Sequence, residues 1–177
     1  MSKKLKKLKR FGICFLFSSF VLAYLLRKTQ GFDLFLFIIL ISILTDLGGY
    51  IFGKIFKGPK LTKISPNKTY SGVIGSFLVS VIGGLIYLEF LPGVLFWSYF
   101  NGYEQAGIGY NLFTLLIISI ISLISQLGDL TISFFKRLAK IKDTGNILPG
   151  HGGLLDRIDG IIFVVPFSYI ILNFTGY

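Results

Sequence analysis

The chain has 177 residues, of which 53% are hydrophobic and only 15% are charged. Soluble domains carry about 25% charged residues, so this composition excludes a water-soluble globular domain. The net charge of +10 is confined to a few segments between long uncharged stretches. This pattern favours anionic lipid or a phosphorylated substrate at a membrane surface over nucleic acid. The single cysteine, Cys14, excludes an intramolecular disulfide and a thiolate metal cluster.

Five uncharged runs are candidates for membrane-spanning helices, which need about 20 apolar residues to cross a hydrocarbon core of about 30 Å. In chain order they lie at Phe11–Leu26, Phe32–Gly53, about 70–88, about 111–128 and about 158–174. The first is marginal in length. The runs are continuous and lack the polar alternation of barrel strands. The sequence therefore predicts an all-α integral membrane protein with about five transmembrane helices.

The Lys and Arg residues predict how these helices are oriented. Residues 1–10 hold six of the 18, residues 54–68 hold five, and residues 136–157 hold five. With five spans and an N-terminus in the cytoplasm, all three segments lie on the cytoplasmic side, as the positive-inside rule requires. No small-residue cleavage site follows the first span, so it is interpreted as a retained anchor. We divide the chain into a basic start and short anchor at 1–31 and a membrane domain at 32–177.

Acidic residues gather at the same predicted face. Five of the eight lie at or just inside the ends of spans: Asp46, Asp129, Asp143, Asp156 and Asp159. An ionised carboxylate at membrane depth is normally paired, bound to a cation or exposed to a water-filled cavity. Two carboxylates on neighbouring helices, among many lysines and arginines, suit a divalent metal ion that carries phosphate oxygens. The role of Asp46 stays open between lining a cavity, orienting a lysine and facing water.

The spacing around the fourth span is more specific. Asp129, Ser133 and Lys136 follow i, i+4 and i+7, so a helix that continues past the span would carry all three on one face. Downstream, the segment P-G-H-G-G at 149–153 resembles a phosphate cradle, because glycines let backbone N–H groups approach an anion. Alone, this segment is equally compatible with a tight turn.

The stretch from Ser133 to Asp159, S-F-F-K-R-L-A-K-I-K-D-T-G-N-I-L-P-G-H-G-G-L-L-D-R-I-D, resembles the signature of the phosphatidate cytidylyltransferases, or CDP-diacylglycerol synthases. Three further pieces are similar to other motifs of that family: Q-L-G-D-L at 126–130, T-D-L-G-G-Y-I-F-G-K-I-F-K at 45–57 and I-S-P-N-K-T-Y-S-G at 64–72. The resemblance covers about residues 45–175. Members usually carry additional N-terminal membrane helices, so the resemblance implies a member shortened at its N-terminus.

The resemblance implies an enzyme that transfers the cytidylyl group of CTP to phosphatidic acid with Mg²⁺, giving CDP-diacylglycerol and pyrophosphate. It implies catalytic roles for Asp129, Lys136 and Asp156, with Asp129 and Asp156 as the metal ligands and a second cation left open. The substrate-binding residues that it implies are Ser65, Lys68, Thr69, Ser133, Arg137, Lys142, Asp143, His151, Gly152, Gly153, Arg157 and Asp159.

The expected partners are CTP, phosphatidic acid and membrane lipid, with a homodimer as the assembly to test and no nucleic acid. The expected location is the inner or plasma membrane of a bacterium, with the site facing the cytoplasm. A CTP-dependent kinase of a lipid alcohol and a non-catalytic lipid-binding relative stay open as alternatives. A CDP-alcohol phosphotransferase is disfavoured, because the pattern D-G-x-x-A-R followed by G-x-x-x-D-x-x-x-D is absent.

Overall fold

The structure, a computed structural model, describes residues 3–62, 65, 68–90, 112–141, 144, 153, 155 and 158–174. These residues form helices α1 (Lys3–Gln30), α2 (Phe32–Phe56), α3 (Tyr70–Phe90), α5 (Leu112–Leu138) and α6 (Asp159–Phe174). Four helices are long and apolar enough to cross a membrane, over Arg10–Gln30, Phe32–Phe56, Tyr70–Glu89 and Thr114–Leu138. The predicted all-α integral membrane fold is thus confirmed.

The helices differ in length from the apolar runs that predict them. α1 extends beyond Phe11–Leu26 at both ends, and α5 continues through Leu138. The reason is that Lys and Arg favour a helix about as strongly as Leu does, although they do not favour a membrane. α6 has 16 residues and is therefore about 24 Å long, short of the hydrocarbon core of about 30 Å. Over the described residues, the fifth predicted span is present as a helix that is shorter than a full span.

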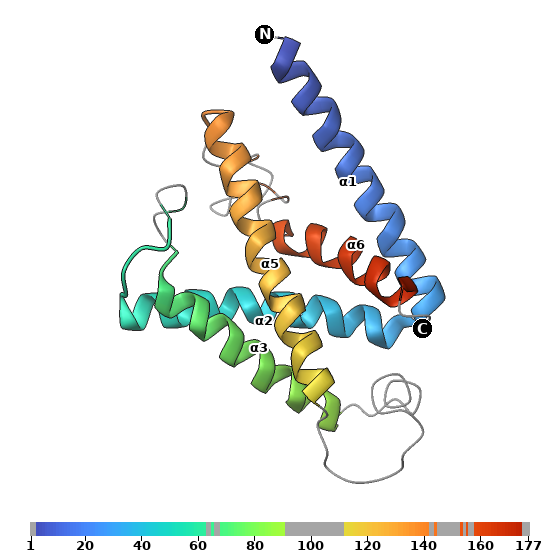
Figure 1. The fold of residues 1–177 in the computed structure, drawn as a ribbon, viewed down its shortest axis with the longest axis vertical. Helices are drawn as coiled ribbons and strands as arrows, with labels where there is room; N and C mark the ends of the chain where they lie inside the picture. Colours follow the sequence, from blue (N-terminus) through green and yellow to red (C-terminus); the bar gives the residue numbers. More distant parts are fainter. Residues whose placement is uncertain are drawn as a thin grey trace.

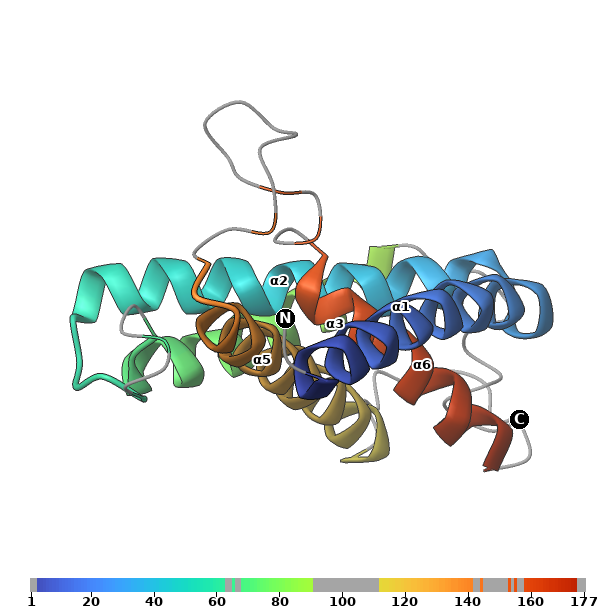
Figure 2. The ribbon, with the colours of Figure 1, turned by 90° about the horizontal axis from the view of Figure 1, so that it is seen from above.

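The helices cross one another around a shared core. Figure 1 shows α5 crossing α2 and α3, with α6 lying between α5 and α1. From above, α1 and α5 lie on the same side of α2 (Figure 2). The core residues come from several helices and include Leu26, Phe37, Ile41, Ile118 and Val164. Burial of these side chains holds the crossing in place. The helices α2, α5 and α6, which contribute to this core, also carry polar residues.

α2 and α3 pack through glycines that bring their backbones close together. A Cβ atom at Gly48 would lie 2.5 Å from the carbonyl oxygen of Gly75, and one at Gly72 would lie 2.8 Å from the carbonyl oxygen of Gly49. Small residues allow this approach between membrane helices, where van der Waals packing replaces the hydrophobic effect as the main attraction. The α2–α3 pair therefore tolerates no side chain at these positions.

We expect Gly48→Ala to destabilise the protein, because the added methyl group meets backbone that cannot rotate away. Overpacking of this kind costs about 1–3 kcal/mol, which lowers the Tm by about 2–4 °C per kcal/mol for a chain of this size. The measurement is thermal unfolding in detergent. The matched control is Gly12→Ala on α1, where an added Cβ meets nothing within 4 Å. Equal Tm values for the two variants would contradict the close approach of α2 and α3.

Candidate active site

A polar cavity of about 330 Å³ opens between α2, α3, α5 and the start of α6. Its lining combines carboxylates, hydroxyls and a lysine: Thr45, Asp46, Gly49, Tyr50, Lys68, Thr69, Gly72, Val73, Ser76, Gln126, Asp129, Ser133 and Asp159. These residues come from four separate parts of the sequence. A cavity with such a lining among apolar helices is a candidate site for a polar or charged ligand.

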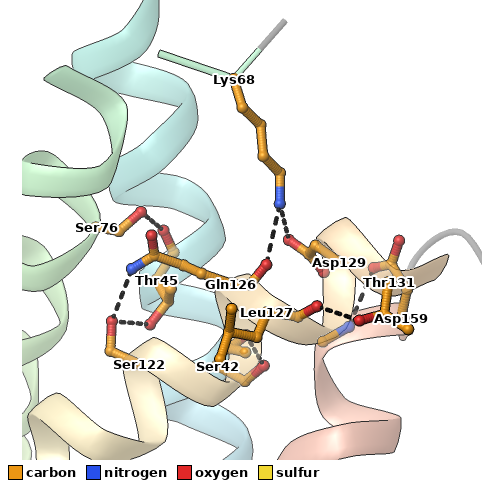
Figure 3. Close-up of polar contacts among 12 residues, drawn as sticks. Ser42, Thr45, Lys68, Ser76, Ser122, Gln126, Leu127, Asp129, Thr131 and Asp159 are labelled. Atoms are coloured by element: carbon orange, nitrogen blue, oxygen red, sulfur yellow. Dashed lines mark hydrogen bonds and ion pairs between the residues drawn. The ribbon is translucent and has the colours of Figure 1, made fainter. Parts of the chain in front are cut away.

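A lysine and an aspartate of α5 form an ion pair in the cavity. Lys68 Nζ lies 3.2 Å from Asp129 Oδ2 and 3.5 Å from the carbonyl oxygen of Gln126 (Figure 3). The Lys68 side chain is 28% exposed and that of Asp129 is 15% exposed. This ion pair is therefore largely shielded from water. In such a shielded place the attraction between unlike charges is stronger than at an open surface.

The loop before α3 holds Lys68 in this position. The N–H group of Leu61 donates to the Lys68 carbonyl oxygen at 2.8 Å, and an isolated antiparallel bridge joins Lys60 to Thr69. Thr69 Oγ1 then accepts from the N–H group of Gly72 at 3.1 Å, which caps the start of α3. Lys68 thus projects from a loop pinned on both sides, and Thr69 has a structural role besides lining the cavity.

A second lysine and two further carboxylates complete the charged cluster. Lys136 Nζ lies 3.9 Å from Asp159 Oδ2, and both side chains are 14% exposed. Asp46, Asp129 and Asp159 all line the same cavity. Three carboxyl groups and two ammonium groups therefore gather at one place.

Two hydroxyl pairs tie α2 to α5 beneath these carboxylates: Ser42–Ser125 at 2.8 Å and Thr45–Ser122 at 3.0 Å. Figure 3 shows this hydroxyl network next to the ion pair of Lys68 and Asp129. Asp46 follows Ser42 by four residues on α2, and Asp129 follows Ser125 by four residues on α5. Residues i and i+4 lie on one face of a helix, so Asp46 shares the face of α2 that carries Ser42, and Asp129 shares the face of α5 that carries Ser125; both carboxyl groups line the cavity.

The structure brings many of the predicted site residues together. Five of them line the cavity: Lys68, Thr69, Ser133, Asp129 and Asp159. Lys136 joins the cluster through its ion pair with Asp159. Ser65 and Arg137 do not line the cavity, and Arg137 is exposed near the end of α5. Gly153 is buried. The remaining predicted residues lie outside the described part of the chain: Lys142, Asp143, His151, Gly152, Asp156 and Arg157.

Sequence reasoning left several cavity residues out of the predicted site. Asp46, whose role stayed open, lines the cavity with its neighbour Thr45, and Ser76 and Gln126 do the same from α3 and α5. A signal for Asp46 was its position inside an apolar run, where a carboxylate is costly. Ser76 gave no comparable signal, since serine is common in membrane helices that pack closely.

Asp129 offers one ligand atom of the kind that a hard divalent cation prefers. Asp129 Oδ1 is buried and has no hydrogen-bond partner among the described residues. Carboxylate oxygens are the ligands that Mg²⁺ prefers in proteins. Within the described residues no group of three or more His, Cys, Asp or Glu side chains has the geometry of a metal site. The second predicted ligand, Asp156, lies outside those residues.

Comparison with known proteins gives a consistent match. The model of the cytidylyltransferase family matches residues 1–175. The phosphatidate cytidylyltransferases of Staphylococcus saprophyticus and Staphylococcus aureus are each 44% identical to the chain over 147 residues, which cover 82% of this chain and 51% of each relative. That of Staphylococcus haemolyticus is 42% identical over the same length. The chain spans about half the length of the curated relatives it matches. With a family model matched over nearly all of its length, the chain belongs to the cytidylyltransferase family.

Proposed function

We propose that this protein transfers the cytidylyl group of CTP to phosphatidic acid, forming CDP-diacylglycerol and pyrophosphate. The observation that carries the proposal is the pairing of Lys68 with Asp129 and of Lys136 with Asp159 around one polar cavity. The names of the relatives support the same activity. Both substrates are anionic, so a site for them needs cationic groups beside groups that hold a metal ion.

The chemistry is a displacement at phosphorus. A phosphate oxygen of phosphatidic acid forms a bond to the α-phosphorus of CTP, while the bond from that phosphorus to the bridging oxygen of the β-phosphate breaks. Pyrophosphate leaves with the electron pair. The attacking phosphate is already ionised, so the step requires no strong general base; it requires positioning and stabilisation of the charge on the phosphoryl oxygens.

Residues of this chain supply both requirements. In this proposal Lys68, which lines the cavity, and Lys136, which pairs with Asp159, contact phosphate oxygens, and the Ser133 hydroxyl in the cavity serves as a hydrogen-bond donor. We propose that Asp129 and Asp156 hold Mg²⁺. When bound, this ion neutralises phosphate charge and polarises the phosphoryl group. Asp129 Oδ1, which has no hydrogen-bond donor among the described residues, provides a free ligand atom for it.

The membrane location follows from the same chemistry. The protein is a membrane protein with four candidate spans, and its named relatives are bacterial. We propose that it resides in the plasma membrane with the cavity facing the cytoplasm, where CTP is available and where the lysine-rich segments lie under the positive-inside rule. A homodimer is part of this proposal, and the mass of the purified protein in detergent tests it.

The test uses the purified full chain in lipid with phosphatidic acid, Mg²⁺ and CTP labelled at either the α- or the γ-phosphate. We expect the lipid product to retain the α label and to lose the γ label, because pyrophosphate carries the γ-phosphate away. Asp156→Asn should form no product under the same conditions. Retention of the γ label would identify a CTP-dependent lipid kinase instead. Folded protein that binds CTP without forming either product would contradict the proposed enzymatic activity and favour a lipid-binding role.

A further inference from the structure

Gly160, in the first turn of α6, has three polar side-chain atoms around its Cα. A Cβ atom at this position would lie 2.5 Å from Ser125 Oγ, 3.2 Å from Asp129 Oδ1 and 3.2 Å from Ser42 Oγ. The first distance is too short for any real contact, so an added methyl group would have to displace something. The start of α6 can reach α5 here only because residue 160 has no side chain.

The neighbours of Gly160 cannot easily move away. Ser125 and Ser42 are fully buried and are joined by a hydrogen bond of 2.8 Å. Asp129 Oδ2 is held by Lys68 at 3.2 Å, while its Oδ1 faces Gly160 without a hydrogen-bond donor among the described residues. An added methyl group would therefore move either the carboxylate of Asp129 or the start of α6.

Sliding of α6 along α5 is also restricted. Gly128 of α5 packs on Phe163 of α6, and a Cβ at Gly128 would lie 3.0 Å from the Phe163 Cβ and ring. Two close contacts, one on each helix, thus define how α5 and α6 cross. The same turn of α6 carries Asp159, whose Oδ1 accepts from the Gly160 N–H at 3.2 Å. Any shift of this turn would move Asp159 relative to Asp129.

We infer that Gly160 is a positioning residue: by allowing the start of α6 to lie against Ser125 and Asp129, it sets the distance between the carboxylates that α5 and α6 contribute to the site. The expected effect on the reaction rate rests on the proposed function. The expected effect on the positions of the carboxylates rests on the geometry of the chain alone. A displacement of about 1 Å in a site of this kind costs up to about 100-fold in rate.

The test compares three variants in the purified full chain: Gly160→Ala, the double variant Gly160→Ala with Ser125→Gly, and Gly83→Ala. The double variant removes the Ser125 Oγ that the new methyl group would meet. Gly83→Ala is the matched control, since a Cβ there would lie 2.5 Å from the Leu44 Cδ1, outside the cavity. The readouts are Tm, the rise in Tm with Mg²⁺ in the absence of substrates, kcat, and KM for CTP.

We expect Gly160→Ala to lower kcat about 10- to 100-fold, with KM for CTP changed less than about 2-fold, and to weaken the rise in Tm with Mg²⁺. The double variant should regain most of the wild-type kcat and most of the rise in Tm with Mg²⁺. Gly83→Ala should change neither kcat nor the dependence on Mg²⁺, because the added methyl group meets only the end of the Leu44 side chain. If Gly160→Ala alone does not fold, recovery of folding and of the Mg²⁺ response in the double variant still supports the contact with Ser125.

Two outcomes would overturn the inference: an unchanged Mg²⁺ response and kcat in folded Gly160→Ala, or equal losses in Gly160→Ala and Gly83→Ala. Absence of any Mg²⁺ response in the wild-type protein would also overturn it. Failure of the proposed function is seen separately, as absence of CDP-diacylglycerol from the wild-type chain. In that case the Mg²⁺-dependent rise in Tm still decides the role of Gly160.

Discussion

Replacement of Asp129 by asparagine should lower the rate of cytidylyl transfer at least about 100-fold while the protein stays folded. Asp129 lies at the centre of the charged cluster: one oxygen is paired with Lys68, and the other is buried without a hydrogen-bond donor among the described residues. The amide keeps the size of the side chain but removes its negative charge. It therefore removes a proposed ligand of Mg²⁺, whose stabilisation of phosphoryl charge is worth several kcal/mol.

The measurement is the initial rate of CDP-diacylglycerol formation at saturating CTP, with Tm recorded for each variant. Asp33→Asn is the matched control, since Asp33 is an exposed carboxylate near the start of α2 and does not line the cavity. It should retain the wild-type rate. A rate for Asp129→Asn within about threefold of wild type would remove Asp129 from the proposed machinery.

Replacement of Lys68 by methionine should lower kcat/KM for CTP by about 30- to 100-fold. Methionine keeps the unbranched apolar chain but removes the ammonium group that lies 3.2 Å from Asp129. A positioned charge that stabilises phosphoryl oxygens contributes on the order of 2–4 kcal/mol to the transition state. The substitution also leaves Asp129 without its cation, which should cost about 1–3 kcal/mol of folding stability.

A double-mutant cycle separates these two effects. Once Asp129 has become asparagine, Lys68→Met should cost less stability than it does alone, because the two residues contact each other. Lys28→Met is the control, since Lys28 is an exposed lysine in the last turn of α1. Additive changes in the free energy of unfolding, measured for the single and double variants, would show that the ion pair contributes nothing to stability.

Much of the fold could be predicted from the sequence because its signals are local. Continuous apolar runs identify membrane helices, and the four long spans lie where those runs predict them. The spacing of Asp129 and Ser133 also placed both on one helical face, and both line the cavity. Helix ends were less predictable, because α5 continues through Lys136 and Arg137, which favour a helix without being apolar.

The composition of the site could be predicted only in part. Motif residues such as Lys68 and Asp159 were recognised by resemblance, and the structure places them at one cavity. Asp46, Ser76 and Gln126 needed the structure, because a single polar residue in an apolar run does not reveal which neighbour it faces. The glycine-rich segment at 149–153 and Asp156 remain predictions, since they lie outside or largely outside the described residues.

The sequence by itself determined that this protein is helical, that it belongs to a membrane, and which faces of its helices carry charge. Only the tertiary structure decided which charges meet. Lys68 and Asp129 are 61 positions apart, and Ser42 and Ser125 are 83 positions apart. Such contacts depend on where helices cross and how closely their backbones approach. That approach is controlled by the absence of a side chain at Gly48 and Gly160, and the pattern of apolar residues along the chain does not encode it.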